Sequence, residues 1–378
     1  MAGYETPGLP SVVPSGIEGF AVDTNLTVGA APQVGKMTTN QIGPSNNFRN
    51  LLDGGDFTTN PFQRGTSTTG ITNTVTYTAD RWFAVGGASS SISVSQQAIT
   101  AGLYPGFGYA LQWGRASANA NTATIYLGQV METLDSIRLQ GQNLVVSFGA
   151  IAGANLSSAG GLVTVTAYSG TGANQSAANM IAGSWTNQTT IGKATFAVSQ
   201  TTWSALTYQF FSLGVVPTTA TQVGLVFSYV PVGTAGSNDW VQFVGIQLET
   251  GSYPSQFEHR DVQVELEIAQ RFCFAPGGTV GALAGGAATS STAAGFFVNF
   301  PVQMRAAPTA APVTTAADLS VYTYANASVA ACSAVAFGSA NPTGAHITVT
   351  SSGMTTAVPY VLYIATALNG NIVFSADF

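Results

Sequence analysis

The stretch VQFVGIQLE (241–249) alternates in the manner of a β-strand. Successive side chains of a strand point to opposite faces of its sheet. Two sets of residues should therefore separate, with Val241, Phe243, Gly245 and Gln247 on one side and Val244, Ile246 and Leu248 on the other. The stretch LVTVTAY (162–168) repeats the pattern, with its threonines facing out. Both stretches predict strands that lie against a core.

Similar short runs recur through the region between residues 50 and 258. Thr, Val, Tyr and Phe cluster in these runs and glycines separate them, which is typical of strands and turns. Candidate strands lie at 74–78, 81–85, 91–96, 109–113, 122–130, 143–151, 162–168, 193–198, 205–213, 222–229 and 240–248. About ten strands at this spacing are the signature of a β-sandwich or jelly roll. The sequence therefore predicts an all-β protein.

A second, smaller β domain is predicted after this region. Small residues dominate the stretch 276–295, which indicates a loop or a weak hairpin. Further strands are expected at 296–302, 318–325, 345–352, 358–368 and 371–378. Asn369 and Gly370 separate the last two, and both tolerate the positive φ of a type I′ turn. The chain should therefore end in a hairpin.

The region before the sandwich is predicted to be an extended arm. Residues 1–45 are rich in Pro and Gly, and they carry apolar side chains such as Phe20 and Leu26 rather than solvating charges. We expect this arm to become ordered on a partner. The predicted division of the chain is an arm (1–45), a jelly-roll sandwich (46–258), a short connector (259–275) and a C-terminal β domain (276–378).

The connector contains an unusual concentration of charge. Only 7% of the chain is charged, yet the stretch FEHRDVQVELEIAQRFCF (257–274) carries six charged side chains. Its apolar residues fit both strand alternation and helical spacing, but Asp261 can cap a helix and Arg271 suits a helix end. We predict a short helix whose charges solvate its outer face. The alternative is a catalytic site formed by Glu258, His259 and Asp261.

Composition excludes several classes of function. Ten Lys and Arg residues are scattered through the chain, which argues against a nucleic-acid partner. The start MAGYETPGLPSVV lacks a basic region followed by an apolar run, so we expect no signal peptide, and we expect no membrane insertion because no window is apolar enough. Cys273 and Cys332 are expected to be buried thiols. The C-terminal domain contains few charged residues, only Arg305, Asp318 and Asp377, which favours packing between copies of the chain.

Separated stretches that cover about residues 50–310 and the last few residues together carry a family resemblance. They include NLLDGGDFTTNPFQRG (50–65), YTADRWFA (77–84), ELEIAQRFCF (265–274) and FSADF (374–378). Their order resembles modules of bacteriophage tail-fibre and other virion proteins, in which an N-L-L-x-N-G-D-F strand precedes Q-R-G, A-D-R-W and E-L-x-x-C-Q-R-Y-Y/F. Ala269 stands where that family often has cysteine. The first stretch and VGIQLE…G also resemble jelly-roll carbohydrate-binding modules.

The resemblance implies a structural protein of the bacteriophage virion. We expect a trimeric tail or neck fibre subunit that displays a lectin-like sandwich to a host-surface glycan. Residues 1–45 would attach it to other virion proteins. The alternatives are a capsid decoration or head-fibre protein with a purely structural role, and a polysaccharide depolymerase. No carboxylate pair lies in a glycosidase motif and no G-x-S-x-G motif occurs, so we expect no enzymatic activity.

The resemblance to carbohydrate-binding modules also suggests site residues. Sugar faces would stack on exposed aromatic rings, and the candidates are Trp185 in GSWTNQ and Tyr104, Phe107 and Tyr109 in LYPGFGYA. Such modules often hold a structural calcium ion, for which the candidates are Asp56, Asp239 and Glu249. The short glycine runs GFG and GTG lack the rest of a nucleotide-binding signature, so no other cofactor is expected.

Overall fold

The protein is built almost entirely from β-sheets, which confirms the predicted fold class. The computed structural model describes residues 48–199, 201–203, 208–276, 280–308, 315–325, 327–366 and 372–378. These form two six-stranded sheets, one seven-stranded sheet and one two-stranded sheet. The predicted arm (1–45) lies outside the described residues, and the predicted domain boundaries stay predictions.

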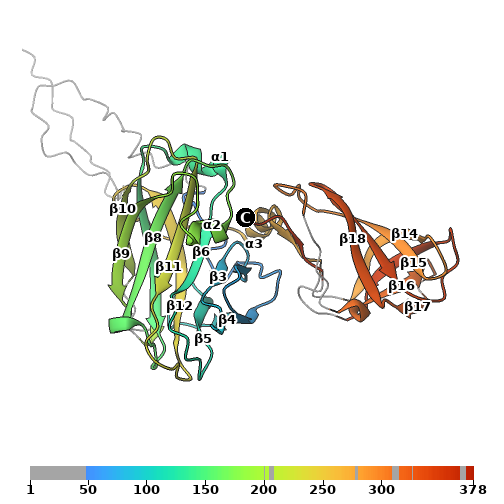
Figure 1. Cartoon of the computed structure of the whole chain (residues 1–378), viewed down its shortest axis with the longest axis horizontal. Coiled ribbons are helices and arrows are strands. Elements are labelled where there is room, and N and C mark those ends of the chain that lie inside the picture. Colours follow the sequence, from blue (N-terminus) through green and yellow to red (C-terminus); the bar gives the residue numbers. More distant parts are fainter. Residues whose placement is uncertain are drawn as a thin grey trace, which may run out of the picture. The chain divides into compact units, whose positions relative to one another are not determined.

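Two antiparallel sheets form the sandwich (Figure 1). The first sheet contains, in spatial order, β1 (Ser67–Ile71), β4 (Ile92–Ala98), β5 (Tyr109–Arg115), β12 (Trp240–Thr250), β7 (Asn143–Ala152) and β10 (Gln209–Val215). The second contains β2 (Thr76–Tyr77), β3 (Phe83–Val85), β6 (Ile125–Val130), β11 (Gln222–Tyr229), β8 (Leu162–Gly170) and β9 (Thr189–Ala197). From β5 to β8 the chain alternates between the sheets, as it does in jelly rolls.

Aromatic rings fill the space between the two sheets. Phe227 of β11 lies 4.7 Å from Phe243 of β12 and 5.1 Å from Phe148 of β7, measured between ring centroids. Trp113 of β5 packs edge-on against Tyr229 of β11 at 5.0 Å. Burying each such side chain contributes about 1.5–3 kcal/mol, so this layer holds the sheets together.

A bulge in β12 changes which residues face the core. Gly245 has a φ of +53°, and the pairing of β12 with β7 shifts between Val244 and Gln247. Ile246 therefore joins Phe243 in the core, whereas Val244 packs outside it. The prediction that Phe243 and Ile246 lie on opposite sides was wrong because the bulge inserts one residue into the alternation.

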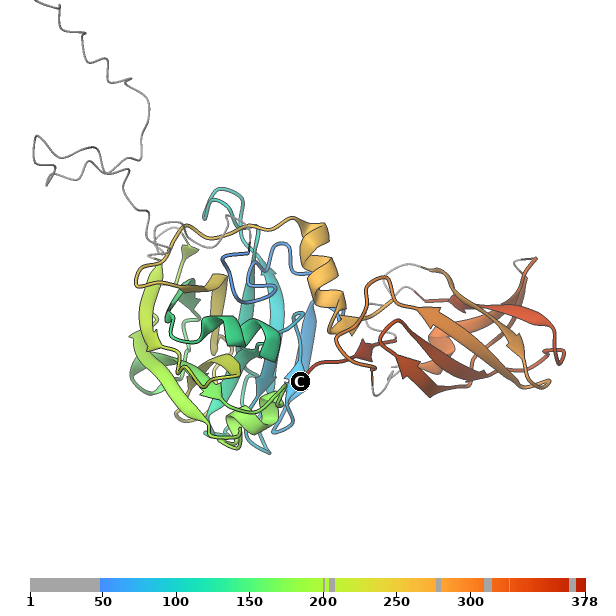
Figure 2. The same cartoon turned by 90° about the horizontal axis from the view of Figure 1, so that it is seen from above.

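Short helices connect the strands: α1 (Thr133–Ser136), α2 (Ala177–Ile181), α3 (Val262–Gln270) and the 3₁₀ turns Ile137–Leu139, Ala159–Gly161 and Ala316–Asp318. The helix α3 confirms the predicted connector helix, and Figure 2 shows it beside the sandwich. The Asp261 carboxylate caps it by accepting from the Gln263 amide at 2.8 Å. None of the helices in the described ranges has the length and hydropathy needed to cross a membrane.

The seven-stranded sheet closes on itself as a small barrel (Figure 1). Its spatial order is β17 (Ser328–Ala331), β16 (Leu319–Thr323), β20 (Pro359–Ile364), β14 (Gly281–Ala288), β15 (Ala293–Asn299), β19 (Gly344–Thr350) and β18 (Ala334–Asn341). The two ends of this order, β17 and β18, are consecutive in the chain. The amide of Cys332 bonds to Leu319 and the amide of Ser333 to Thr350, both at 2.8 Å. The continuous segment that contains β17 and β18 thus pairs with β16 at one end and with β19 at the other, which brings the two ends of the sheet together.

The end of the chain pairs differently from the prediction. The strand β21 (Phe374–Ser375) pairs with β13 (Cys273–Phe274), not with the strand that contains 358–364. The predicted terminal hairpin is therefore wrong, and its turn at 369–370 lies outside the described residues. Between 280 and 299 the structure contains β14 and β15 as a hairpin, which is one of the two alternatives predicted there. Both cysteines are buried thiols, as expected.

Arg81 lies where four segments meet. Its side chain is 2% exposed and its φ is +72°, which is unusual for a residue with a Cβ. Nε pairs with Asp53 at 3.0 Å, Nη2 donates to the Val130 carbonyl at 2.7 Å, and Nη1 lies 3.7 Å from Asp377. The guanidinium carbon lies 3.4 Å from the centroid of the Phe272 ring. One buried cation thus connects the segment before β1, the end of β6, the segment after α3 and the segment after β21.

The last described residues add further contacts to the same place. Asp377 also pairs with Arg64, and the Tyr77 hydroxyl donates to the Phe378 carbonyl at 3.1 Å. The guanidinium carbon of Arg305 lies 3.9 Å from the centroid of the Phe378 ring. The FSADF stretch therefore has a structural role, because it contacts the segments around Arg64 and Tyr77 of the sandwich.

We predict that Arg81→Lys lowers the free energy of unfolding by about 3 kcal/mol. Lysine keeps the charge, but it cannot stack on Phe272 and also reach Asp53 and the Val130 carbonyl, so it leaves buried groups without partners. Denaturant unfolding monitored by tryptophan fluorescence measures the loss. The matched control is Arg138→Lys in an exposed ion pair, which should change stability by less than about 0.5 kcal/mol. Equal effects of the two variants would contradict the role given to Arg81.

Candidate functional site

A polar row crosses the outer face of the first sheet. The strand registers align Ser95 of β4, Gln112 of β5 and Gln242 of β12, with the apolar Ile151 of β7 next to Gln242. They alternate with core residues, so they share the face that points away from the second sheet. The Gln242 amide donates to the Gln112 carbonyl oxygen at 2.9 Å, and both side chains are partly exposed. The row is uncharged.

Trp240 lies at one end of this face. It occupies the outer position two residues before Gln242, a step of about 7 Å along the strand. A Cβ on Gly153 would lie 2.8 Å from Cε2 of the indole, so the absence of a side chain there lets the ring lie close to the sheet. Trp240 remains partly exposed. It therefore offers an indole face beside the two glutamines.

A cluster of aromatic rings lies at the other end. The ring of Tyr104 stacks on that of Phe107 at 5.6 Å and lies 5.9 Å from Trp203. Phe107 approaches the bulge in β12, where a Cβ on Gly245 would lie 2.6 Å from Cζ of its ring. The structure thus brings two predicted sugar-stacking residues, Tyr104 and Phe107, to one edge of the polar row. Burial raises the pKa of the Tyr104 hydroxyl, so it is a neutral hydrogen-bonding group.

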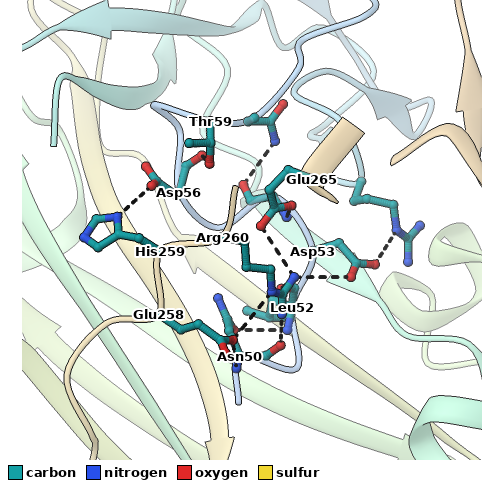
Figure 3. Close-up of polar contacts among 12 residues, drawn as sticks. Asn50, Leu52, Asp53, Asp56, Thr59, Glu258, His259, Arg260 and Glu265 are labelled. Atoms are coloured by element: carbon teal, nitrogen blue, oxygen red, sulfur yellow. Dashed lines mark hydrogen bonds and ion pairs between the residues drawn. The ribbon is translucent and has the colours of Figure 1, made fainter. Parts of the chain in front are cut away.

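His259 extends this cluster and is fixed by Asp56 (Figure 3). Its ring lies 5.0 Å from both Phe107 and Phe257, and its Nδ1 lies 2.9 Å from Oδ2 of Asp56. Asp56 is buried, whereas 44% of the His259 side chain is exposed. The other Asp56 oxygen accepts from the Thr58 amide at 2.9 Å. Asp56 therefore orients an exposed imidazole at the aromatic end of the face.

Three of the six charges of the connector, Glu258, Arg260 and Glu265, lie inside the protein, which corrects the prediction that the charges solvate a helix face. Asp261, Glu267 and Arg271 are at least partly exposed. Arg260 donates to the Asn50 carbonyl and lies 3.5 Å from both Glu258 and Glu265 (Figure 3). Glu265 accepts from the Gly54 amide at 3.0 Å. These groups bind the connector to the segment before β1. Partners so distant in the sequence cannot be recognised from the pattern of the connector itself.

The alternative catalytic site of Glu258, His259 and Asp261 is not assembled. Glu258 accepts from the Asn50 amide at 2.9 Å, His259 pairs with Asp56, and Asp261 caps α3. Each of the three has a separate structural partner.

Two other predicted sugar-binding residues lie elsewhere. Trp185 is buried against Met180 of α2, and its indole nitrogen donates to the Ser176 carbonyl at 2.9 Å. The prediction of an exposed Trp185 ring was wrong because α2 covers it. Tyr109 is 41% exposed, but its side chain lies on the same side of β5 as Leu111, opposite to Gln112. It therefore lies outside the polar row.

The residues predicted to bind calcium do not form one donor set. Asp239 is fully buried against Arg115 at 2.9 Å and also accepts from Ser157. Glu249 accepts from Ser255 and Gln247. Asp56 is held by His259. Among the residues that the structure describes, no group of three or more His, Cys, Asp or Glu could hold a metal ion. The structure gives the three carboxylates structural roles.

Gln112, Gln242 and Trp240 were not predicted as site residues. Their signal is present in the sequence, because each lies at the polar or outward position of a strand whose alternate residues are apolar. Which side of each strand faces away from the second sheet becomes apparent only after the strands are paired.

Solved structures similar to this chain include β-sandwich carbohydrate-binding modules and a phage tailspike domain. TmCBM61 in complex with β-1,4-galactotriose is 16% identical, covering 54% of this chain and 99% of that chain, with a TM-score of 0.31. The C-terminal family 22 carbohydrate-binding module of Clostridium thermocellum Xyn10B is 13% identical, covering 46% and 89%, with a TM-score of 0.29. The enzymatically active domain of bacteriophage CBA120 tailspike protein 4 is 10% identical, covering 54% and 22%, with a TM-score of 0.30.

Comparison at the level of sequence gives no relative. No protein-family model and no curated protein matches the chain. The likenesses to solved structures are distant, and no function is transferred from them.

Glu265 should make the stability of the protein depend on pH. Burial raises the pKa of Glu265 from its ordinary 4.5 to about 7, although Arg260 opposes the shift. The folded state therefore binds this proton more tightly than the unfolded state. Its contribution is full below about pH 4.5 and is lost as the pH rises through about 7. The loss is on the order of 3 kcal/mol.

The variant Glu265→Gln should remove this dependence. We expect the free energy of unfolding of the parent protein to fall more steeply between about pH 4.5 and 7 than that of Glu265→Gln, as measured by denaturant unfolding at each pH. Glu267→Gln, on the exposed side of the same helix, is the matched control and should follow the parent. Parallel curves for the parent and Glu265→Gln would contradict this prediction.

Proposed function

We propose that the outer face of the first sheet binds a neutral glycan chain without cleaving it. The observation that carries this proposal is the uncharged Gln112–Gln242 pair, which lies between Trp240 and the Tyr104–Phe107 cluster. Trp240, Gln242 and Val244 occupy successive outer positions of β12, at intervals of about 7 Å. The extended face suits a chain of sugars better than a single ring.

The residue types match the surface chemistry of a saccharide. A sugar ring has a C–H face that packs on an aromatic ring, and its hydroxyls both donate and accept hydrogen bonds. A glutamine amide offers both functions, so the pair can exchange hydrogen bonds with water for hydrogen bonds with hydroxyls. Because the polar row has no charged side chain, the binding of a neutral sugar removes water from no charged group.

The absence of cleavage is part of the proposal. Glycosidases use two carboxyl groups at separations of roughly 5–9.5 Å beside the scissile bond. In the described part of the chain, Asp56 is the carboxylate that contacts the aromatic end of the face, and it is buried under His259. Incubation of the purified protein with host envelope polysaccharide should release no reducing ends. Sugar release that is lost in Asp56→Asn would overturn this part of the proposal.

We further propose that the chain is a subunit of a bacteriophage fibre or appendage, located on the virion and trimeric. The sequence resemblance to virion modules and the small number of charged residues after residue 276 support this. Residues 1–45 would attach it to other virion proteins. Many copies on one particle would turn weak sugar contacts into firm attachment to the host surface. Mass spectrometry of purified particles should detect the chain, and its absence would contradict the virion assignment.

Substitutions on the face should weaken glycan binding. We expect Trp240→Ala and Gln242→Ala each to reduce affinity for an immobilised neutral oligosaccharide about tenfold, which corresponds to about 1.4 kcal/mol. A panel of neutral and acidic glycans, followed by calorimetry with the best neutral ligand, measures this. Tyr253→Ala removes an exposed aromatic ring outside the row and is the matched control. If Trp240→Ala and Gln242→Ala bind as the parent does, the face is not the binding site.

A further inference from the structure

The outer face of the barrel carries a second row of polar and aromatic side chains. The strand registers align Ser339 of β18, His346 of β19 and Phe297 of β15. Core residues such as Phe296 and Ile347 alternate with them, so this row faces away from the barrel interior. Phe297 is 68% exposed, and its ring lies 4.9 Å from that of His346.

Glycines on both neighbouring strands allow His346 to lie flat on the sheet. A Cβ on Gly295 of β15 would lie 2.6 Å from Nε2 of the imidazole, and a Cβ on Gly338 of β18 would lie 2.7 Å from Nδ1. Neither distance is possible for a real side chain, so each glycine is needed for this position of the ring. In the sandwich, the absence of a side chain at Gly153 allows the ring of Trp240 to lie close to the sheet in the same way.

A shallow pocket lies beside these rings. Its volume is about 250 Å³, and its lining includes Phe297, Asn299, Ser339, Asn341 and His346. The lining has no Asp, Glu, Lys or Arg. Asn341 uses its carbonyl oxygen to accept from Thr343 and Gly344, so its amino group can donate to a ligand. The exposed amides and hydroxyl can exchange water for the hydroxyls of a ligand.

We propose that this pocket is a second saccharide site, which binds a single neutral sugar residue. Phe297 and His346 would pack against the C–H face of the sugar, and Asn299, Ser339 and Asn341 would bind its hydroxyls. Pockets for drug-sized ligands are roughly 300–1,000 Å³, so about 250 Å³ suits one sugar ring rather than a chain. The site is formed wholly by barrel residues, so it does not depend on the proposed function of the sandwich face.

Two sites on one chain would strengthen attachment. The barrel and the sandwich face would bind different positions of the same glycan layer, and the second contact would form at the high effective concentration set by the first. The barrel site would therefore contribute chiefly to retention on a dense glycan surface and little to binding of a free short oligosaccharide.

The test uses the full chain and a panel of immobilised neutral mono- and oligosaccharides. Trp240→Ala weakens binding at the sandwich face, and we expect residual binding to remain. Adding Phe297→Ala or His346→Ala should reduce this residual binding at least about fivefold, which corresponds to about 1 kcal/mol. Tyr324→Ala, an exposed aromatic residue elsewhere on the barrel, is the matched control and should have no effect.

A further variant tests the position of the ring without removing it. Gly295→Ala places a methyl group against the far end of the His346 side chain, so it should displace the imidazole and lower residual binding while the melting temperature is kept. Residual binding that is unchanged by Phe297→Ala, His346→Ala and Gly295→Ala would overturn the barrel site and leave the sandwich face standing. Complete loss of binding in Trp240→Ala alone would also overturn it. Dissociation of oligomers by Phe297→Ala, with sugar binding unchanged, would show that another copy of the chain occupies this face.

Discussion

The burial of the Arg81 guanidinium is the constraint on which the rest of the structure depends. A buried cation is tolerated only when its charge is compensated, and here Asp53 and the Val130 carbonyl accept hydrogen bonds from Arg81, while Asp377 and the ring of Phe272 lie close to its charge. The residue also adopts a positive φ, which costs of the order of 1 kcal/mol or more. Four distant segments must therefore reach one point before the cost of burying Arg81 is offset.

The two faces proposed to bind sugar are determined by the packing and pairing of the strands. Alternation along paired strands directs every second residue away from the core, so a well-packed sandwich and a closed barrel each determine the side chains of their outer surface. Glycines in neighbouring strands then let rings lie flat, as for Trp240 and His346. Because the strands are rigid, these rings lose little freedom when a ligand binds, which is what a weak, multivalent attachment requires.

The sequence predicted the elements better than it predicted their partners. The strands around 143–151, 222–229 and 240–248 and the α3 helix are confirmed because their periodicity and the Asp261 cap act over a few residues. Tyr104 and Phe107 stack on each other beside the polar row, and their role in sugar binding stays a prediction. Trp185 was not, since the helix that covers it is too short for its packing to be apparent from the pattern.

The amino-acid sequence by itself determined that this protein is made of short strands with one helical connector, because backbone preference and alternation are local properties. Only the tertiary structure decided that Ile246 turns inward after the bulge at Gly245, that β21 pairs with β13, and that Glu265 is buried. Each of these depends on contacts between distant residues, such as the Asn50–Glu258 hydrogen bond across 208 positions. Burial in the folded protein, rather than residue type, gave Glu258 and Glu265 a structural role.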